Sequence, residues 1–147
     1  MLAGSLMTTG ESTETGRRLR LLGCRMERGK YTTSRVYVEF DGPAPGQRIV
    51  CHQDGFATSG GDLRLAAMAT LNALTQATGG LLAFVLIGVK PVRAFEATVI
   101  MVGISLQRDG ETTRLVGAAI ADDDQLVATA RAVLHATNRF ATPLLRE

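Results

Sequence analysis

Residues 124–140 read DQLVATARAVLHATNRF, and this stretch has the periodicity of an amphipathic helix. Aspartates stand at its start and Arg139 lies near its end, so charges of favourable sign meet both ends of the helix dipole. Pro143 follows and is typical of a helix end. The sequence therefore predicts a helix over about 124–140. Its apolar stripe consists of Leu126, Ala130, Val133 and Thr137.

A similar helix is predicted earlier in the chain, over residues 63–78. Asp62 stands at the expected N-cap, and Gly79 and Gly80 follow the last turn. One face of this helix consists of Leu63, Ala67, Leu71 and Leu74. When the chain is shifted by 63 residues, ATLNAL at 69–74 lies over AVLHAT at 132–137. The two helices therefore look like copies of one unit.

Three strand-like runs precede each helix. The runs are 17–26, 34–40 and 47–52 in the first half, and 81–90, 95–106 and 112–121 in the second. Turn residues separate them at 27–30, at DGPAPG (41–46) and at QRDG (107–110). This order predicts an α+β fold of duplicated, two-layer βββα units, at about 17–80 and 81–141. We expect both units to form a single domain over 17–147, after a flexible leader at 1–16.

Composition narrows the classes of function. The chain has 147 residues, of which 46% are hydrophobic and 20% charged, which suits one folded domain. A net charge of +2, no Trp and 5% aromatic residues argue against a nucleic-acid partner, and the basic cluster from Arg17 to Lys30 is interpreted as a solvated strand face. The sequence has no signal-peptide pattern and no apolar run that could span a membrane, so we expect a cytoplasmic protein.

The second helix also carries a family resemblance. Asp124 opens it, small residues alternate along it, and Asn138 and Arg139 close it. The alternating positions are Ala128, Ala130, Ala132, Leu134 and Ala136. In this spacing, and in strand order over about 17–140, the chain resembles the C-terminal regulatory domain of the 2-isopropylmalate and citramalate synthases, an allosteric, leucine-sensing domain. The resemblance implies a domain built from two βββα units.

The resemblance also implies a regulatory role. The synthases of this family carry a catalytic barrel with a metal site, which 147 residues cannot supply, so a stand-alone regulatory domain is implied. Such a domain senses a small molecule, in the family a branched-chain amino acid or its relative, at a site formed between units in a dimer. Residues 58–62 (TSGGD) keep the glycines and the aspartate of the family's ligand loop but lack its Gly-Pro step.

The two expected helix N-termini are the candidate ligand site. Free backbone N–H groups there suit a carboxylate, and the aspartates suit an ammonium group. The candidate ligand-binding residues are Ser59, Gly60, Gly61, Asp62, Asp123 and Asp124. Two simpler interpretations stay open: residues 58–62 are only a strand-to-helix turn, and the run of three aspartates from Asp122 only caps its helix rather than binding a metal.

Catalytic chemistry finds little support in the sequence. Cys51 and His52 are adjacent in a strand, so their side chains point to opposite faces. A pair between Cys24 and His52 across strands is the remaining thiol alternative. The two cysteines have no C-x-x-C spacing and no His/Cys ligand array, so neither a zinc site nor a disulfide framework is indicated. We expect no catalytic residues, no metal and no cofactor.

The apolar runs of the second half indicate a partner surface. Val85, Ile87 and Val89 alternate along one run, as do Val99, Met101 and Gly103 along the next, and the residues between them are also apolar. One helix layer covers only one face of a sheet, so the other face predicts a homodimer. The sequence thus favours a homodimeric, non-catalytic domain that binds an amino acid or a 2-keto/2-hydroxy acid. The alternative is a dimerisation or scaffold module that docks a partner protein and has no small-molecule ligand.

Overall fold

The computed structural model describes residues 19–58 and 60–145. The leader predicted at 1–16 and the candidate ligand residue Ser59 lie outside the described residues. The elements in order are β1 (Arg20–Arg28), β2 (Thr33–Asp41), β3 (Arg48–Phe56), α2 (Gly61–Ala77), β4 (Ala83–Ala94), β5 (Ala97–Arg108), β6 (Glu111–Ala121), α3 (Gln125–Ala141) and the short 3-10 helix η1 (Thr142–Leu144).

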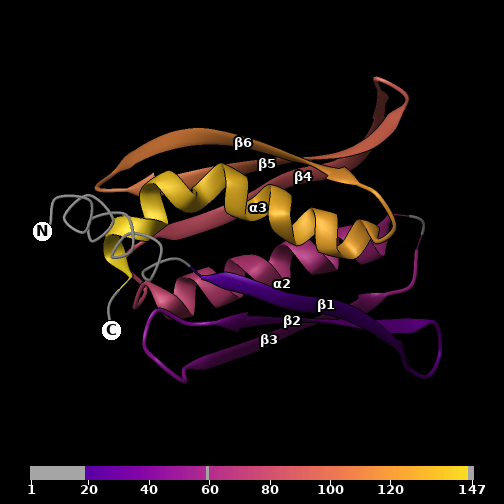
Figure 1. The fold of residues 1–147 in the computed structure, drawn as a ribbon, viewed down its shortest axis with the longest axis horizontal. Coiled ribbons are helices and arrows are strands. Elements are labelled where there is room, and N and C mark those ends of the chain that lie inside the picture. Colours follow the sequence, from indigo (N-terminus) through magenta and orange to yellow (C-terminus); the bar gives the residue numbers. More distant parts are fainter. Residues whose placement is uncertain (1–18, 59, 146–147) are drawn as a thin grey trace, which may run out of the picture.

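The predicted α+β fold of duplicated βββα units is confirmed. Two antiparallel sheets form, in the orders β1-β2-β3 and β4-β5-β6, and a helix follows each one. Each unit has two layers, and the units stack through their helices, so that α2 and α3 lie side by side between the sheets (Figure 1). Besides its own sheet, each helix contacts the first strand of the other unit, because α2 touches β4 and α3 touches β1.

Local backbone details are also duplicated. β1 has a bulge between Leu21 and Gly23, and β4 has one between Leu86 and Gly88. The hairpin after β1 turns through Tyr31 and Thr32, and the hairpin after β4 turns through Phe95 and Glu96. All four of these turn residues have positive φ, between 53° and 61°, as a two-residue type I′ turn requires. The two units therefore share their turn and bulge geometry as well as their element order.

The helices match at the shift of 63 residues that the sequence predicts. At this shift Leu65 corresponds to Ala128, and Ala66 corresponds to Thr129, and all four are buried. Further along, the buried Thr70 corresponds to the buried Val133. The buried faces of α2 and α3 are therefore related by the same 63-residue repeat as their amino-acid sequences.

Several boundaries differ from the prediction, among them the end of β3, which was expected at residue 52 and lies at Phe56. α2 starts at Gly61 with Gly60 at the N-cap, so the N-cap role predicted for Asp62 is wrong and Asp62 lies in the first turn. β1 continues through residue 28, and the turn moves from 27–30 to Tyr31 and Thr32, because the register pairs Arg28 with Ser34. β4 likewise continues past residue 90 to Ala94, with Pro91 tolerated on this edge strand.

The core lies between the inner faces of the two sheets and the helix pair. The middle strand of each sheet supplies fully buried apolar side chains, Val36, Val38 and Phe40 from β2 and Ile100, Val102 and Ile104 from β5. The buried helix positions are mainly alanines, such as Ala66, Ala69, Ala130 and Ala132. Short side chains let the helix layer approach both sheets closely, and packing of this density fixes the position of the helix ends.

Candidate functional site

The amino-terminal ends of α2 and α3 lie at the same end of the molecule (Figure 1). β3 ends where Phe56 pairs with Thr33, beside the first hairpin of its sheet, and β6 ends where Ala121 pairs with Thr98, beside the equivalent hairpin. Each helix therefore starts at the hairpin end of its own sheet. The two helices run in the same direction, so the positive ends of both dipoles face one region. The predicted ligand residues of the two units are thus brought to one end.

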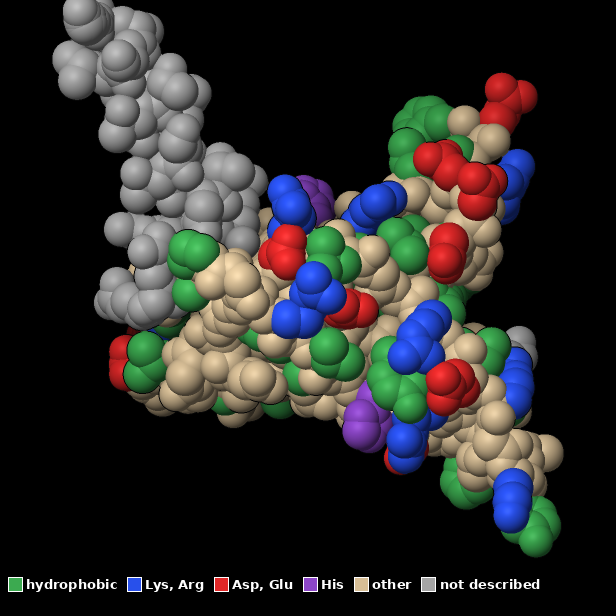
Figure 2. Space-filling model, turned by 60° about the horizontal axis from the view of Figure 1, so that its bottom comes forward, with side chains coloured by type: hydrophobic (Ala, Val, Ile, Leu, Met, Phe, Trp, Pro, Cys, Tyr) green, Lys and Arg blue, Asp and Glu red, His purple; other side chains and the backbone are tan. Residues whose placement is uncertain are grey.

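Two hairpins project past this end. Figure 2 shows them as separate arms, β1–β2 below and β4–β5 above, with a notch between them. Their tips carry Tyr31, which is 89% exposed, and Phe95, which is 99% exposed. The helix N-termini therefore open between two arms with apolar tips.

At the start of α2, Asp62 is held in a cluster of three polar side chains. Its Oδ1 accepts a hydrogen bond from Ser34 Oγ at 3.0 Å, and its Oδ2 lies 3.3 Å from Arg28 Nη2. Arg28 Nη1 also donates to Ser34 Oγ at 3.0 Å, and Ser34 is buried. Asp62 therefore fastens the first turn of α2 to β1 and β2, and its carboxylate is already paired.

The backbone before α2 is left-handed at Gly60, with φ of 76°. Gly60 has no side chain to cap the helix, so within the described residues α2 starts without a side-chain cap. A Cβ at Gly61 would overlap the hydroxyl of Thr58, so the turn also depends on this second glycine. The first turn of α2 is thus the less occupied of the two helix N-termini.

At the start of α3, Asp124 caps the helix. Its Oδ1 accepts hydrogen bonds from the amides of Leu126 at 2.9 Å and Val127 at 3.2 Å. The capping interpretation of Asp124 is therefore confirmed. Both bonds use one oxygen, which leaves Oδ2 outside the cap. Asp123 is exposed, and no hydrogen bond or ion pair engages its side chain within the described residues.

The cysteines do not form a catalytic pair with His52. Cys24 and Cys51 flank Val38 in one row of the inner face, whereas His52 lies on the outer face, where its ring contacts that of Tyr37 at a centroid distance of 5.6 Å. The alternative of a Cys24–His52 pair is therefore wrong. Burial, with a smaller effect of Asp124, raises the pKa of Cys24 to about 12, and burial also raises the pKa of Cys51. Neither thiol is activated for nucleophilic attack.

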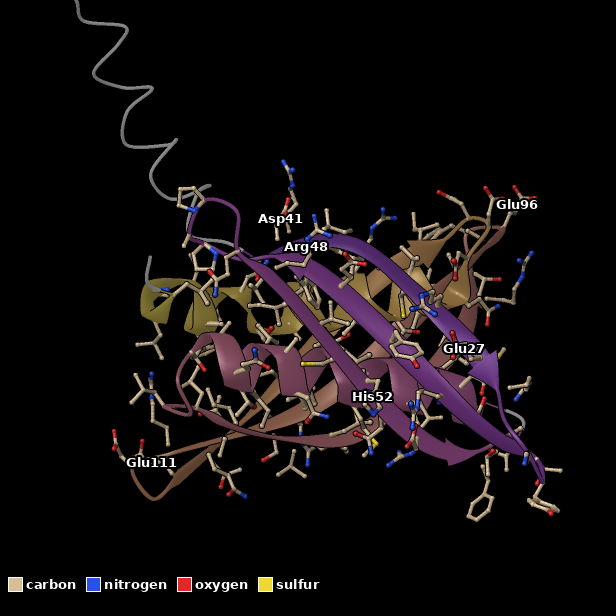
Figure 3. The ribbon with its side chains drawn as sticks, turned by 90° about the horizontal axis from the view of Figure 1, so that it is seen from below. Glu27, Asp41, Arg48, His52, Glu96 and Glu111 are labelled. Atoms are coloured by element: carbon tan, nitrogen blue, oxygen red, sulfur yellow. The ribbon has the colours of Figure 1, made fainter. Side chains whose placement is uncertain are left out.

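The outer face of the first sheet carries many charged side chains, and most of them form ion pairs with each other. Figure 3 shows this face, with Glu27, Asp41, Arg48 and His52 spread over the three strands. The ion pairs on it are Arg20–Asp41, Arg25–Glu27, Arg35–Asp54, Arg48–Glu39 and Arg48–Asp41. Hydrogen bonds from the Arg35 guanidinium lower the pKa of Asp54. The arginines of the predicted basic cluster that belong to β1 thus meet carboxylates.

This face also has a hollow that the sequence did not indicate. It has a volume of about 510 Å³ and lies near the hairpin end, with Glu27, Arg35, Asp54 and Phe56 among its lining residues. Arg35 and Asp54 are held together by two contacts, Nε to Oδ1 at 2.6 Å and Nη2 to Oδ2 at 3.0 Å. Arg35 and Asp54 are therefore engaged with each other, while Glu27 pairs with Arg25 and Arg28 pairs with Asp62. Only the strand register reveals this pairing, because Arg35 and Asp54 are 19 residues apart.

The outer face of the second sheet is largely apolar, in contrast to the first, and its charged side chains in the described residues are the basic Lys90 and Arg114. Its exposed large apolar side chains are Val85, Ile87, Met101, Val116 and Ile120. Alternation placed Val89 with this set, but Val89 pairs with the buried Val102 and faces inward, because the bulge at Leu86/Gly88 shifts the alternation by one residue. We call Val85, Ile87, Met101, Val116 and Ile120 the apolar face. Its lack of acidic residues distinguishes it from the first sheet.

Within residues 19–58 and 60–145, no group of three or more His, Cys, Asp or Glu side chains is placed to hold a metal ion. No helix in this part of the chain is both long enough and apolar enough to cross a membrane. The molecule is thus an α+β protein of two βββα units with both helix N-termini at one end. Comparison with known proteins gave no matching family model and no curated protein of significant similarity.

Proposed function

We propose that this chain is a non-catalytic regulatory domain that binds a small effector at the N-terminal ends of α2 and α3. The effector is an amino acid or a 2-keto or 2-hydroxy acid, as the resemblance to the synthase regulatory domains implies. One observation carries the proposal: the N-termini of the two parallel helices lie at the end of the molecule from which two hairpins project (Figure 1). Two positive dipole ends in one region favour a carboxylate, and nearby aspartates favour an ammonium group.

The residues divide between the two groups of the effector. The carboxylate meets the backbone N–H groups of Gly60 and of the first turn of α2, which lacks a side-chain cap in the described part of the chain. The Gly61 amide is not among these donors, because it already donates to the carbonyl oxygen of Thr58 at 2.9 Å. An ammonium or hydroxyl group meets Asp123 and the free Oδ2 of Asp124. Asp62 is removed from this set, because Ser34 and Arg28 already occupy its carboxylate. Asp62 therefore does not contact the effector in this proposal; it joins the first turn of α2 to β1 and β2.

Dimerisation through the apolar face completes the proposal. β4 and β5 have 12 residues each, and with β6 they make a face of roughly 40 Å by 14 Å. Two copies packed on this face would bury roughly 1,000 Å², the size at which specific interfaces begin. Within residues 19–58 and 60–145 this face has no acidic side chain to attract a basic partner, which favours a second apolar face as the occupant. The two free cysteines suit the reducing cytoplasm in which we place the dimer.

The second candidate is a scaffold module that docks a partner protein without any small ligand. It is favoured by the occupied states of Asp62 and Asp124, each of which already has a structural partner. In this candidate the apolar face meets the partner protein.

A thermal-shift screen with light scattering separates the two candidates. The purified protein is screened against amino acids and 2-keto and 2-hydroxy acids, since a ligand that binds only the folded state raises the melting temperature with its concentration. We expect one compound class to raise the melting temperature of a dimer, and Asp123→Asn to reduce this shift. A dimer whose melting temperature responds to none of these compounds would favour the scaffold.

A further inference from the structure

A hollow of about 380 Å³ lies between β6 and α3, away from the helix N-termini. It is lined by Arg114, Leu115, Val116, His135, Ala136 and Arg139. His135 is ten residues beyond the first residue of α3, about 15 Å along the helix axis. Because of this separation, the hollow is distinct from the effector site proposed above. We call it the β6–α3 pocket.

The charge of the β6–α3 pocket is not balanced by acidic groups. Every ion pair among the described residues involves an arginine between Arg20 and Arg48, and none includes Arg114 or Arg139. The lining also includes no Asp or Glu. Both arginines thus lack a carboxylate partner among the described residues, and a bound anion would supply one.

The hydrogen-bonding state of His135 adds a donor. Its Nδ1 accepts a hydrogen bond from the amide of Ala118 on β6, at 3.1 Å. Because Nδ1 is an acceptor, the proton of the neutral ring lies on Nε2, which is then free to donate. The pocket therefore has an imidazole N–H as well as two guanidinium groups.

The free edge of β6 supplies a backbone donor. The amide of Ala118 points away from β5, because it donates to His135. In an antiparallel ladder the direction alternates from residue to residue, so the amide of Val116 points to the same free edge. His135 already occupies the Ala118 amide, so among the pocket-lining residues of β6 the amides of Arg114 and Val116 are left on this edge. A group with several acceptor oxygens can accept from such an amide and from the guanidinium groups together.

We propose that the β6–α3 pocket binds a small oxyanion, a carboxylate or a phosphate, between Arg114, Arg139, the His135 Nε2–H and the Val116 amide. Arg139 also lies in the last turn of α3, where a cation complements the helix dipole. That role alone predicts no ligand, whereas the pocket predicts saturable binding that depends on Arg114 as well.

The test is an amide and imidazole NMR titration of the full chain with inorganic phosphate, and separately with succinate, at constant ionic strength set by chloride. We expect saturable shifts at the Val116 amide and the His135 Nε2, and the stronger of the two anions identifies the oxyanion class. Arg114→Gln and Arg139→Gln should each weaken binding about tenfold or more. The matched control is Arg93→Gln, since Arg93 is an exposed arginine that bonds only to Thr98 Oγ1 and should leave binding unchanged.

Two outcomes would overturn the proposal. Shifts that do not saturate with either anion would mean that the pocket does not bind oxyanions. Saturable shifts that survive in both Arg114→Gln and Arg139→Gln would place the anion elsewhere. Melting curves of each variant establish that it is folded. Neither outcome decides the effector site, because binding there would shift the Gly60 amide, which the same spectra resolve separately from that of Val116.

Discussion

The backbone of Gly117 on β6 packs directly against the carbonyl oxygen of Ala132 on α3. A Cβ at position 117 would overlap that oxygen and would lie 2.7 Å from the amide nitrogen of Ala136. This contact clamps α3 onto the edge strand of the second sheet. It also brings His135 to the Ala118 amide, so one glycine positions both the helix and the β6–α3 pocket.

Replacing this glycine should therefore destabilise the fold. We expect Gly117→Ala to lower the free energy of unfolding by about 2–3 kcal/mol, because the added carbon meets helix backbone that cannot move aside alone. Urea denaturation measures the change. Gly88→Ala is the control in the same sheet, since a Cβ there has nothing within 4 Å, and it should cost less than about 1 kcal/mol. Equal losses in both variants would contradict the close packing of α3 on β6.

The cap of α3 gives a second prediction. Asp124→Ala removes the acceptor of the Leu126 and Val127 amides and should cost about 1 kcal/mol in the free energy of unfolding. Asp123→Ala changes the neighbouring exposed aspartate without removing a cap, and its effect should stay within about 0.5 kcal/mol. The same urea experiment compares the two. The assignment of Asp124 as the cap fails if Asp123→Ala is the more harmful change.

The apolar face gives a third prediction, on assembly. Ile120 is 57% exposed on the outer face of the second sheet, and Val50 is 54% exposed on that of the first. We expect Ile120→Arg to convert the dimer into a monomer, because it places an unpaired charge inside an apolar interface. Val50→Arg should leave the dimer intact. Size-exclusion chromatography with light scattering measures the mass, and a dimer lost only with Val50→Arg would move the interface to the first sheet.

Cys24 gives a prediction on pH. Its pKa rises from 9.0 to about 12 in the folded chain, mainly through burial. The folded state then keeps the proton that the unfolded state releases, so this contribution to stability is complete below pH 9 and is lost as the pH rises from 9 towards 12. Urea unfolding measured across this range should show a steeper fall for the wild type than for Cys24→Ala. Parallel slopes would mean that the thiol ionises equally in both states.

The duplicated βββα order could be predicted because it depends on local patterns. Helix periodicity placed residues 63–78 and 124–140, and the glycine at 110 marked a turn that the structure confirms by positive φ at Asp109 and Gly110. The repeat shift of 63 residues could be read for the same reason. A pattern that alternates or recurs within one segment can be recognised in the amino-acid sequence of that segment.

Features that depend on register could not be predicted in this way. A bulge at Leu86/Gly88 turned Val89 inward, although simple alternation placed it outside. Asp62 was expected to contact a ligand, but Ser34 and Arg28, which lie 28 and 34 residues before it, hold its carboxylate. Arg114 and Arg139 meet in one pocket only because α3 packs against β6. Such contacts join segments that are far apart in the sequence, so no local sequence pattern predicts them.

Binding of an effector between the N-termini of α2 and α3 can be tested by mapping the amide chemical-shift changes that the effector causes. The compound that most strongly raises the melting temperature is titrated into the labelled protein. We expect saturable shifts concentrated at Gly60, Gly61 and the residues from Asp123 to Gln125, and we expect these shifts to be smaller in Asp123→Asn. Shifts confined to other parts of the molecule, or no saturable shift with any of the amino acids and 2-keto or 2-hydroxy acids, would contradict it.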